Sequence, residues 1–164
     1  MGLFDWLKRA VATKETVIMS VPDAPPWQKL SAVDRDILTR TLWGEARGEP
    51  EAGQIAVVHV VRNRVIARGT NAATECQRPW QFSCWNTNDP QRARLEALLP
   101  ISDVYLALAK VVDKAWPLPD VTGAARHYYA PAAMVPKNSV PPWAKPPARE
   151  TLRIGGHIFY AGVA

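Results

Sequence analysis

Residues 50–69 constrain the fold more than any other stretch, because a helix there would be apolar on nearly every side. Its apolar positions are Ile55, Ala56, Val57, Val58, Val60, Val61, Val65 and Ile66. Several of them are β-branched, which also suits a buried strand, but the segment is far longer than a typical strand of about five or six residues. Pro50 suits the first turn of a helix, and Gly69 suits the position after its end. We therefore predict a buried central helix.

The residues before it, 31–46, predict an amphipathic helix that ends ahead of Gly48. Ser31 or Asp34 can cap its start. Its apolar face carries Val33, Ile37, Leu38, Thr41 and Leu42. Glu49 falls in the turn that follows, where it precedes or caps the central helix.

Glu45 lies on the apolar face of this first helix, because it follows Leu42 by three residues and Thr41 by four. A carboxyl group in apolar surroundings keeps its proton to higher pH, since burial disfavours the charged form. Such a group can act as a general acid near neutrality. A surface carboxylate paired with Arg40 or Arg47 is the alternative interpretation.

The remaining patterns predict short elements joined by loops. We expect an ordered loop at 71–90, helices at 91–99 and 101–115, a strand at 126–130, a proline-rich loop at 134–147 and a β-hairpin at 152–160. Gly155-Gly156 suits the turn of that hairpin. The predicted fold class is mainly α (α+β), a helical domain with a small C-terminal β-hairpin.

The chain has 164 residues, of which 48% are apolar, and this suits one domain with a full core. We expect residues 1–30 to form an N-terminal arm or linker, because prolines recur from Pro22 to Pro26, and residues 31–164 to form the domain. Residues 1–12 are amphipathic but lack the order of regions typical of a signal peptide. No apolar run approaches the ~20 residues that cross a bilayer, so we expect no stable membrane insertion.

The net charge of +5 favours an anionic partner, such as nucleic acid, an anionic membrane or an acidic wall polymer. The arginines are scattered rather than gathered in a nucleic-acid-binding motif, so we expect no nucleic-acid partner. A noncatalytic binding module driven by charge is one alternative function.

Two polar positions are candidates for binding a ligand. The segment around Trp85 and Asn86 mixes flat aromatic faces with amide and hydroxyl groups, which suits a sugar ring and equally suits the edge of a core. Asn63 lies on the predicted central helix, where its amide can face a cleft or lie at a solvated helix end.

The histidines and cysteines leave further alternatives open. His127 and His157 would meet if their strands pair, and a metal-dependent amidase or peptidase is the function that such a pair would suit. No two histidines share the short spacing of a zinc-binding pair on a helix, and His59 suits a hydrogen-bonded core position. Cys76 and Cys84 can form a disulfide or remain two reduced thiols.

Several separated segments of the sequence resemble the SleB/CwlJ-type cell-wall hydrolases, enzymes of bacteria, spores and phages that act on peptidoglycan. In chain order these segments are Trp43-Gly44-Glu45-Ala46-Arg47-Gly48-Glu49, Gly53-Gln54, Val61-Arg62-Asn63-Arg64-Val65, Gln81-Phe82-Ser83-Cys84-Trp85, His127-Tyr128-Tyr129, Pro142-Trp143 and Ile154-Gly155-Gly156-His157-Ile158-Phe159-Tyr160. The resemblance implies a lysozyme-like catalytic domain with a glycan-binding cleft and no metal or cofactor. It implies that Glu45 is catalytic. The candidate substrate contacts are Trp85, Asn86, Asn63, His127, Tyr128 and Glu49.

The resemblance also implies a mechanism, in which Glu45 protonates the oxygen between N-acetylmuramic acid and N-acetylglucosamine and then takes a proton back. Attack by the muramic C6 hydroxyl would give an anhydro sugar, the product of a lytic transglycosylase. Attack by water would need a second carboxylate, for which Glu49 is the only nearby candidate. We favour the single-acid mechanism. We expect action on peptidoglycan in the periplasm or cell wall, by an endolysin-like enzyme that stays in the cytoplasm until a phage or prophage partner releases it.

Overall fold

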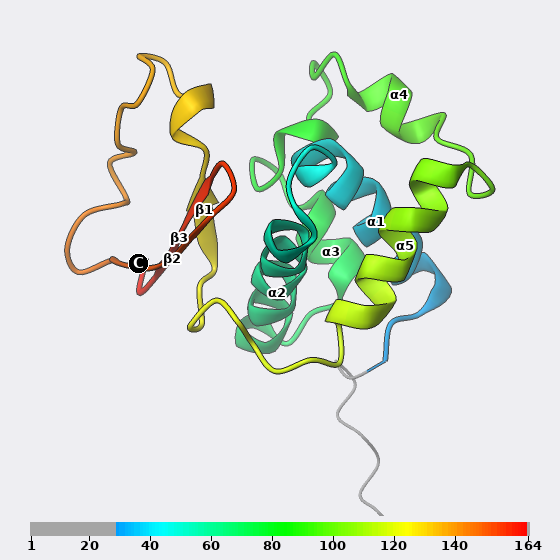
Figure 1. Ribbon diagram of the computed structural model, residues 1–164, viewed down its shortest axis with the longest axis horizontal. Helices are drawn as coiled ribbons and strands as arrows, with labels where there is room; N and C mark the ends of the chain where they lie inside the picture. The colour runs from blue at the N-terminus through cyan, green and yellow to red at the C-terminus, as the bar shows by residue number, and fades with distance from the viewer. Residues whose placement is uncertain (1–28, 164) are drawn as a thin grey trace, which may run out of the picture.

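The computed structural model describes residues 29–163, which form a group of helices beside one small sheet (Figure 1). The elements in chain order are α1 (Ala32–Ala46), α2 (Glu51–Arg68), α3 (Ala72–Gln77), η3 (Ser83–Trp85), α4 (Arg92–Glu96), α5 (Asp103–Ala115), β1 (His127–Tyr129), η4 (Pro131–Ala133), β2 (Arg149–Ile154) and β3 (His157–Ala161). The prediction of a mainly helical fold with a small β part is confirmed. The predicted N-terminal arm lies almost entirely outside the described residues.

Helix α2 is the centre of the fold, as its apolar pattern predicts. It packs against α1, α3 and α5, and in Figure 1 it lies between those helices and the sheet. Val57, Val58, Val60 and Val61 are fully buried. Gly69 ends the helix in the left-handed conformation at φ 63°, where its N–H donates to the Val65 carbonyl.

Helix α1 begins with a capping box and brings its apolar face onto the core. The Ser31 hydroxyl accepts from the Asp34 N–H at 3.0 Å, while the Asp34 carboxylate accepts from the Ser31 N–H at 3.3 Å. Leu38 and Leu42 are fully buried. Glu45, on the same face, is half-buried at the last turn.

The segment at 71–90, predicted as a loop, contains a short helix and a 3-10 turn. Helix α3 is capped by Asn71, whose side chain accepts from the Thr74 N–H at 2.8 Å. Six residues are too few to show a helical repeat of apolar positions, which is why the sequence pattern did not predict this helix. Cys76 and Cys84 are buried free thiols, so the structure contains the reduced alternative.

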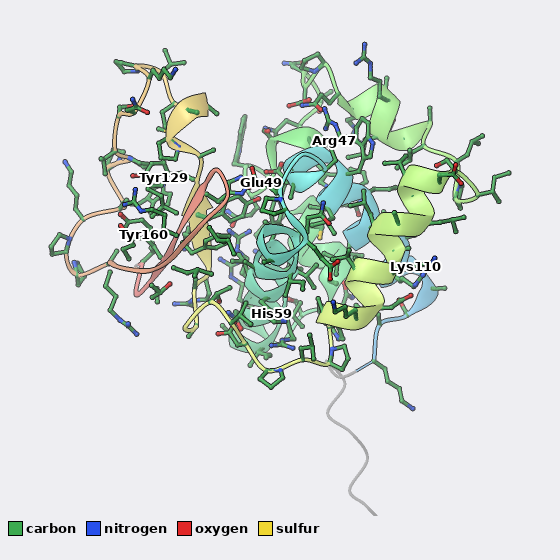
Figure 2. The ribbon with its side chains drawn as sticks, in the orientation of Figure 1. Arg47, Glu49, His59, Lys110, Tyr129 and Tyr160 are labelled. Carbon is green, nitrogen blue, oxygen red and sulfur yellow. The ribbon has the colours of Figure 1, made fainter. Side chains whose placement is uncertain are left out.

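The sheet has three antiparallel strands in the order β1-β3-β2. The hairpin of β2 and β3 is the one predicted at the C-terminal end, and β1 pairs with the other edge of β3. One face of the sheet turns Tyr128 and Phe159 toward the helices, and the other carries Tyr129 and Tyr160. Figure 2 shows Tyr129 and Tyr160 on the side of the sheet away from the helices. Their ring centroids are 6.1 Å apart.

Within the part of the chain that the structure describes, no helix combines the length and hydrophobicity of a bilayer-spanning segment.

Candidate active site

Glu45 meets Tyr128 where the end of α1 faces the sheet. The Tyr128 hydroxyl donates to the Glu45 Oε2 atom at 3.0 Å, across 83 residues of chain. Burial, together with the nearby negative charge of Glu45, raises the pKa of Tyr128 well above its usual range. The phenol therefore keeps its proton and acts as a donor that orients the carboxylate.

The ring of Tyr128 contacts aromatic neighbours from the sheet and from the segment between α3 and α4. Its centroid lies 4.8 Å from that of His157, in an edge-on arrangement, and 5.4 Å from that of Phe159. Phe82 lies on another side at 6.5 Å. Aromatic contacts of this kind fix the orientation of the Tyr128 ring, and they therefore fix the position of its hydroxyl next to Glu45.

Cys84 also lies near the Glu45 carboxylate, and it packs against Gly44, which leaves room for it. A Cβ atom at Gly44 would come within 2.6 Å of the Cys84 Cβ and 2.8 Å of its Sγ, so a larger residue there would push η3 away from α1. Burial, with the nearby charge of Glu45, raises the pKa of the Cys84 thiol. The thiol therefore stays protonated beside the carboxylate. Sequence reasoning did not assign Cys84 to the site, although a glycine inside a helix next to Glu45 signals such a close approach.

Glu49 fastens the tip of the β2–β3 hairpin to the turn between α1 and α2. Its Oε2 atom accepts from the Gly156 N–H at 2.8 Å. A Cβ atom at Gly155, where φ is 55°, would lie 1.8 Å from that oxygen. Figure 2 shows Glu49 between the end of α1 and the hairpin. The glycines of the hairpin turn are therefore needed both for the backbone conformation and for the approach of this carboxylate.

His157 lies between the hairpin tip and Tyr128, and it is neutral near pH 7. Its Nδ1 atom is 3.9 Å from the Glu49 Oε2 atom. Burial lowers the pKa of His157, and the charges of Glu49 and Glu45 only partly offset that effect. The close pair is therefore a neutral imidazole beside a carboxylate.

His127 and His157 lie on opposite faces of the sheet, although their strands do pair. His127 is opposite Tyr160 in the register, and its ring lies 5.4 Å from that of Trp143. Burial and the nearby charge of Arg64 lower the pKa of His127 to about 4. The two histidines are thus not brought together as a metal site would need. Among residues 29–163, no group of three or more His, Cys, Asp or Glu side chains could hold a metal ion.

The predicted contacts Trp85 and Asn86 line a groove of about 590 Å³. Trp85 is only 8% exposed, and its indole N–H donates to the Thr41 hydroxyl at 2.8 Å, so that N–H is not available to a ligand. The groove is lined by Gln77, Arg78, Pro79, Trp80, Trp85, Asn86, Thr87, Asn88, Asp89, Pro90 and Arg92. Trp80 is 85% exposed. Glu45 does not itself line this groove.

The amide of Asn63 is engaged elsewhere. It donates to the Thr122 hydroxyl at 3.1 Å and to the Ala125 carbonyl at 2.9 Å, which uses both of its N–H bonds. Asn63 therefore stabilises the segment that leads into β1, and this geometry gives no support to a substrate contact.

The prediction that His59 is a hydrogen-bonded core residue is confirmed. Its Nδ1 atom accepts from the Val121 N–H at 3.1 Å, so Nε2 carries the proton and donates to the Ala115 carbonyl at 2.9 Å. Burial lowers the pKa of His59, which agrees with this neutral form.

The site therefore consists of one half-buried carboxyl group next to a phenol and a thiol, and the residue after that thiol lines a groove with an exposed tryptophan. A carboxyl group so placed can exchange a proton with a bound molecule, a function of acid–base enzymes. Comparison with known proteins identifies the class. Residues 48–160 match the family described as Cell Wall Hydrolase, which is more than half of the chain.

The chain belongs to this cell-wall hydrolase family, and its resemblance to the SleB/CwlJ-type enzymes is confirmed. The catalytic domain of the Bacillus cereus SleB protein is 26% identical, with a TM-score of 0.62 over 81% of this chain and 93% of that one. The catalytic domain of SleB from Bacillus anthracis, described as a germination-specific lytic transglycosylase, is 26% identical, with a TM-score of 0.61 over 80% and 96% of the two chains. No curated protein matches the chain. Glu45 lies just before the residues that match the family.

Proposed function

We propose that this enzyme cleaves the glycan strands of peptidoglycan as a lytic transglycosylase, with Glu45 as the general acid and base. The observation that carries the proposal is the hydrogen bond from Tyr128 to Glu45, which holds one carboxylate at the junction of α1, η3 and β1. The family membership and the activity named for the Bacillus anthracis relative support the choice of substrate and reaction.

In the proposed reaction, the protonated Glu45 donates its proton to the glycosidic oxygen between N-acetylmuramic acid and N-acetylglucosamine. The bond between that oxygen and the muramic C1 atom breaks. The muramic C6 hydroxyl oxygen then bonds to C1, and its proton passes to the Glu45 carboxylate. The enzyme returns to its starting protonation state, and the products are an anhydromuramyl end and a free N-acetylglucosamine hydroxyl. One carboxyl group is sufficient for both proton transfers.

The contacts of Glu49 favour this single-acid route over hydrolysis. A retaining or inverting glycosidase uses two carboxyl groups that flank the bond to be cleaved. The Glu49 carboxylate is instead bonded to the Gly156 N–H and packed against Gly155, and its side chain is only 18% exposed. We therefore assign Glu49 a structural role at the hairpin.

Three of the predicted substrate contacts lie near Glu45 or in the groove. Tyr128 touches the carboxylate, and Trp85 and Asn86 line the groove. His127 lies on the sheet face away from Tyr128, so it belongs to the site only if the glycan strand extends around the edge of the sheet. The net charge of +5 suits an anionic wall.

Digestion of purified sacculi, followed by mass spectrometry of the fragments, tests the reaction. Anhydromuramyl ends are expected, and reducing muramyl ends would instead indicate hydrolysis with a second carboxylate. EDTA should leave the rate unchanged, whereas a metal-dependent amidase or peptidase would lose activity and would release peptides rather than glycan ends. Binding without any fragments would support a noncatalytic module.

The route to the wall stays a prediction, and expression inside bacteria tests it. Lysis is expected when a membrane-permeabilising phage partner is expressed with the enzyme. Lysis by the enzyme alone would contradict release by a partner.

A further inference from the structure

Trp80 combines two unfavourable features that a ligand would account for. It is 85% exposed to solvent, which leaves a large apolar ring in water. Its backbone φ is 66°, in the left-handed region, where the Cβ atom of a bulky residue crowds the backbone. Such conformations persist only where their surroundings hold them, and they gather at binding and catalytic sites.

The turn that carries Trp80 is firmly anchored. The Gln81 N–H donates to the Arg78 carbonyl at 3.1 Å, which closes the turn. Arg78 in turn pairs with the fully buried Glu75 at 3.0 Å, and the Thr70 hydroxyl donates to the same carboxylate at 2.7 Å. The backbone that carries the exposed indole is therefore held in place. Less conformational entropy would be lost when a ligand contacts the ring.

The groove next to Trp80 has the chemistry of a sugar site. Its wall combines the Trp80 ring with the amide side chains of Gln77, Asn86 and Asn88 and the carboxylate of Asp89. An indole face suits the C–H face of a pyranose ring, and amide groups can hydrogen-bond to its hydroxyl and acetamido groups. The volume of about 590 Å³ is within the range of small-molecule sites.

The groove and the candidate active site are formed in part by consecutive residues of the chain. Trp85, in its wall, follows Cys84, which packs against Gly44 and faces Glu45. In Figure 1 the segment between α3 and α4 lies next to α1, and its 3-10 turn η3 contacts this helix, whose last turn carries Glu45. A glycan strand bound at Glu45 can therefore extend into the groove.

We propose that Trp80 is the platform of a sugar-binding subsite, which holds an N-acetylhexosamine ring of the glycan strand away from the bond that is cleaved. This subsite rests on the proposed function, because the strand is assumed to be cleaved at Glu45. Trp80 does not touch the reacting atoms, so it contributes to binding the strand before and during the reaction alike. Its loss should raise KM and leave kcat nearly unchanged.

Steady-state cleavage of solubilised glycan strands and cosedimentation with intact sacculi, both with the full chain, test the subsite. Trp80→Ala should raise KM and weaken sacculus binding by about two- to tenfold, the loss expected for one aromatic stacking contact. Trp80→Phe should restore part of the binding, because it keeps a ring. Ile101→Ala is the matched control, since Ile101 is 81% exposed but lies outside the groove. It should behave as the wild type.

Equal sacculus binding by Trp80→Ala and the wild type would overturn the subsite, whether or not the wild type cleaves glycan. If it does cleave, equal KM values would overturn the subsite as well. A fall in kcat alone would also overturn it, because that result places Trp80 in the chemistry rather than in binding. If the wild type binds sacculi but does not cleave them, the proposed function fails. Binding that still depends on Trp80 would then support the groove as a saccharide site on its own.

Discussion

Two regions of this enzyme place polar side chains inside the fold, and they use them differently. Along α2, His59, Arg62 and Asn63 bond mainly to backbone carbonyls at the end of α5 and in the segment that follows it. At the end of α1, Glu45 bonds to another side chain, the Tyr128 hydroxyl, and remains half-buried.

The difference separates a structural cluster from a reactive one. Side chains that bond to the backbone satisfy groups that would otherwise be buried without partners, so they stabilise the fold. A carboxylate oriented by one phenol and left partly open keeps acceptor capacity for a bound molecule. We therefore expect changes along α2 to affect stability and changes around Glu45 to affect turnover.

His59→Ala should give the largest loss of stability in the comparison. It would remove the acceptor of the Val121 N–H and one of the two donors to the Ala115 carbonyl, and it would open a cavity beside them. We expect a loss of about 2–4 kcal/mol in the free energy of unfolding. Urea titration measures it. Lys110→Ala, at the exposed surface of α5, is the control and should change stability by less than about 0.5 kcal/mol. Figure 2 shows both positions.

The rate per folded molecule sharpens this prediction. At low temperature His59→Ala should keep a kcat close to that of the wild type, because His59 contacts no group of the Glu45 site. If His59→Ala lowered kcat and left stability unchanged, His59 would act in catalysis, which would contradict its assignment to the structural region.

Tyr128→Phe should have an intermediate effect, and mainly on turnover. The variant keeps the ring contacts with His157 and Phe159 but removes the donor to Glu45. We expect kcat to fall about tenfold, less than the 10²- to 10⁴-fold that a general acid contributes, because Glu45 itself remains, with a stability loss of about 1 kcal/mol. Initial rates and urea titration give the two values. Tyr129→Phe, on the other face of the sheet, should retain kcat, and an equal loss there would contradict the assignment.

Acidification should have the smallest effect, a loss of folding stability. Buried histidines in both regions of the comparison should contribute to this loss. The pKa values of His59, His127 and His157 are all lowered by burial, for His127 to about 4. The unfolded chain therefore binds more protons than the folded protein between about pH 6.5 and pH 4, so stability falls as pH falls.

For the partly exposed His127, the expected loss at pH 5 is on the order of 1 kcal/mol. Urea titrations at pH 7.5 and pH 5 measure it, and His127→Gln should remove that part of the pH dependence. Stability that rises on acidification would contradict the burial of neutral histidines.

The helices could be predicted from the sequence where the spacing of apolar residues along the chain is regular. The helices around Leu42 and Val58 and the position of Glu45 on an apolar face follow from three- and four-residue spacing, which is a property of neighbouring residues. The assignment of His59 to the core followed from the same helical pattern.

The surroundings of Glu45 could not be predicted in this way, because they depend on packing between distant segments. Tyr128 reaches Glu45 only because β1 pairs with β3, and this pairing depends on where the chain returns after α5. Trp85 was predicted as a substrate contact, yet its bond to Thr41 buries it against α1. Aromatic residues alternating with polar ones suit a core edge and a sugar site equally, so composition alone does not distinguish the two.

The central claim is that Glu45 is the general acid and Glu49 is not. The most direct test makes the same carboxyl-to-amide change at each of these two positions. With purified sacculi as substrate, Glu45→Gln should keep the fold but lower the yield of anhydromuramyl ends by about 10²- to 10⁴-fold, the contribution expected of a general acid. Glu49→Gln, which retains an acceptor for the Gly156 N–H, should produce those ends at close to the wild-type rate. Wild-type yields from Glu45→Gln, or a loss confined to Glu49→Gln, would contradict the account.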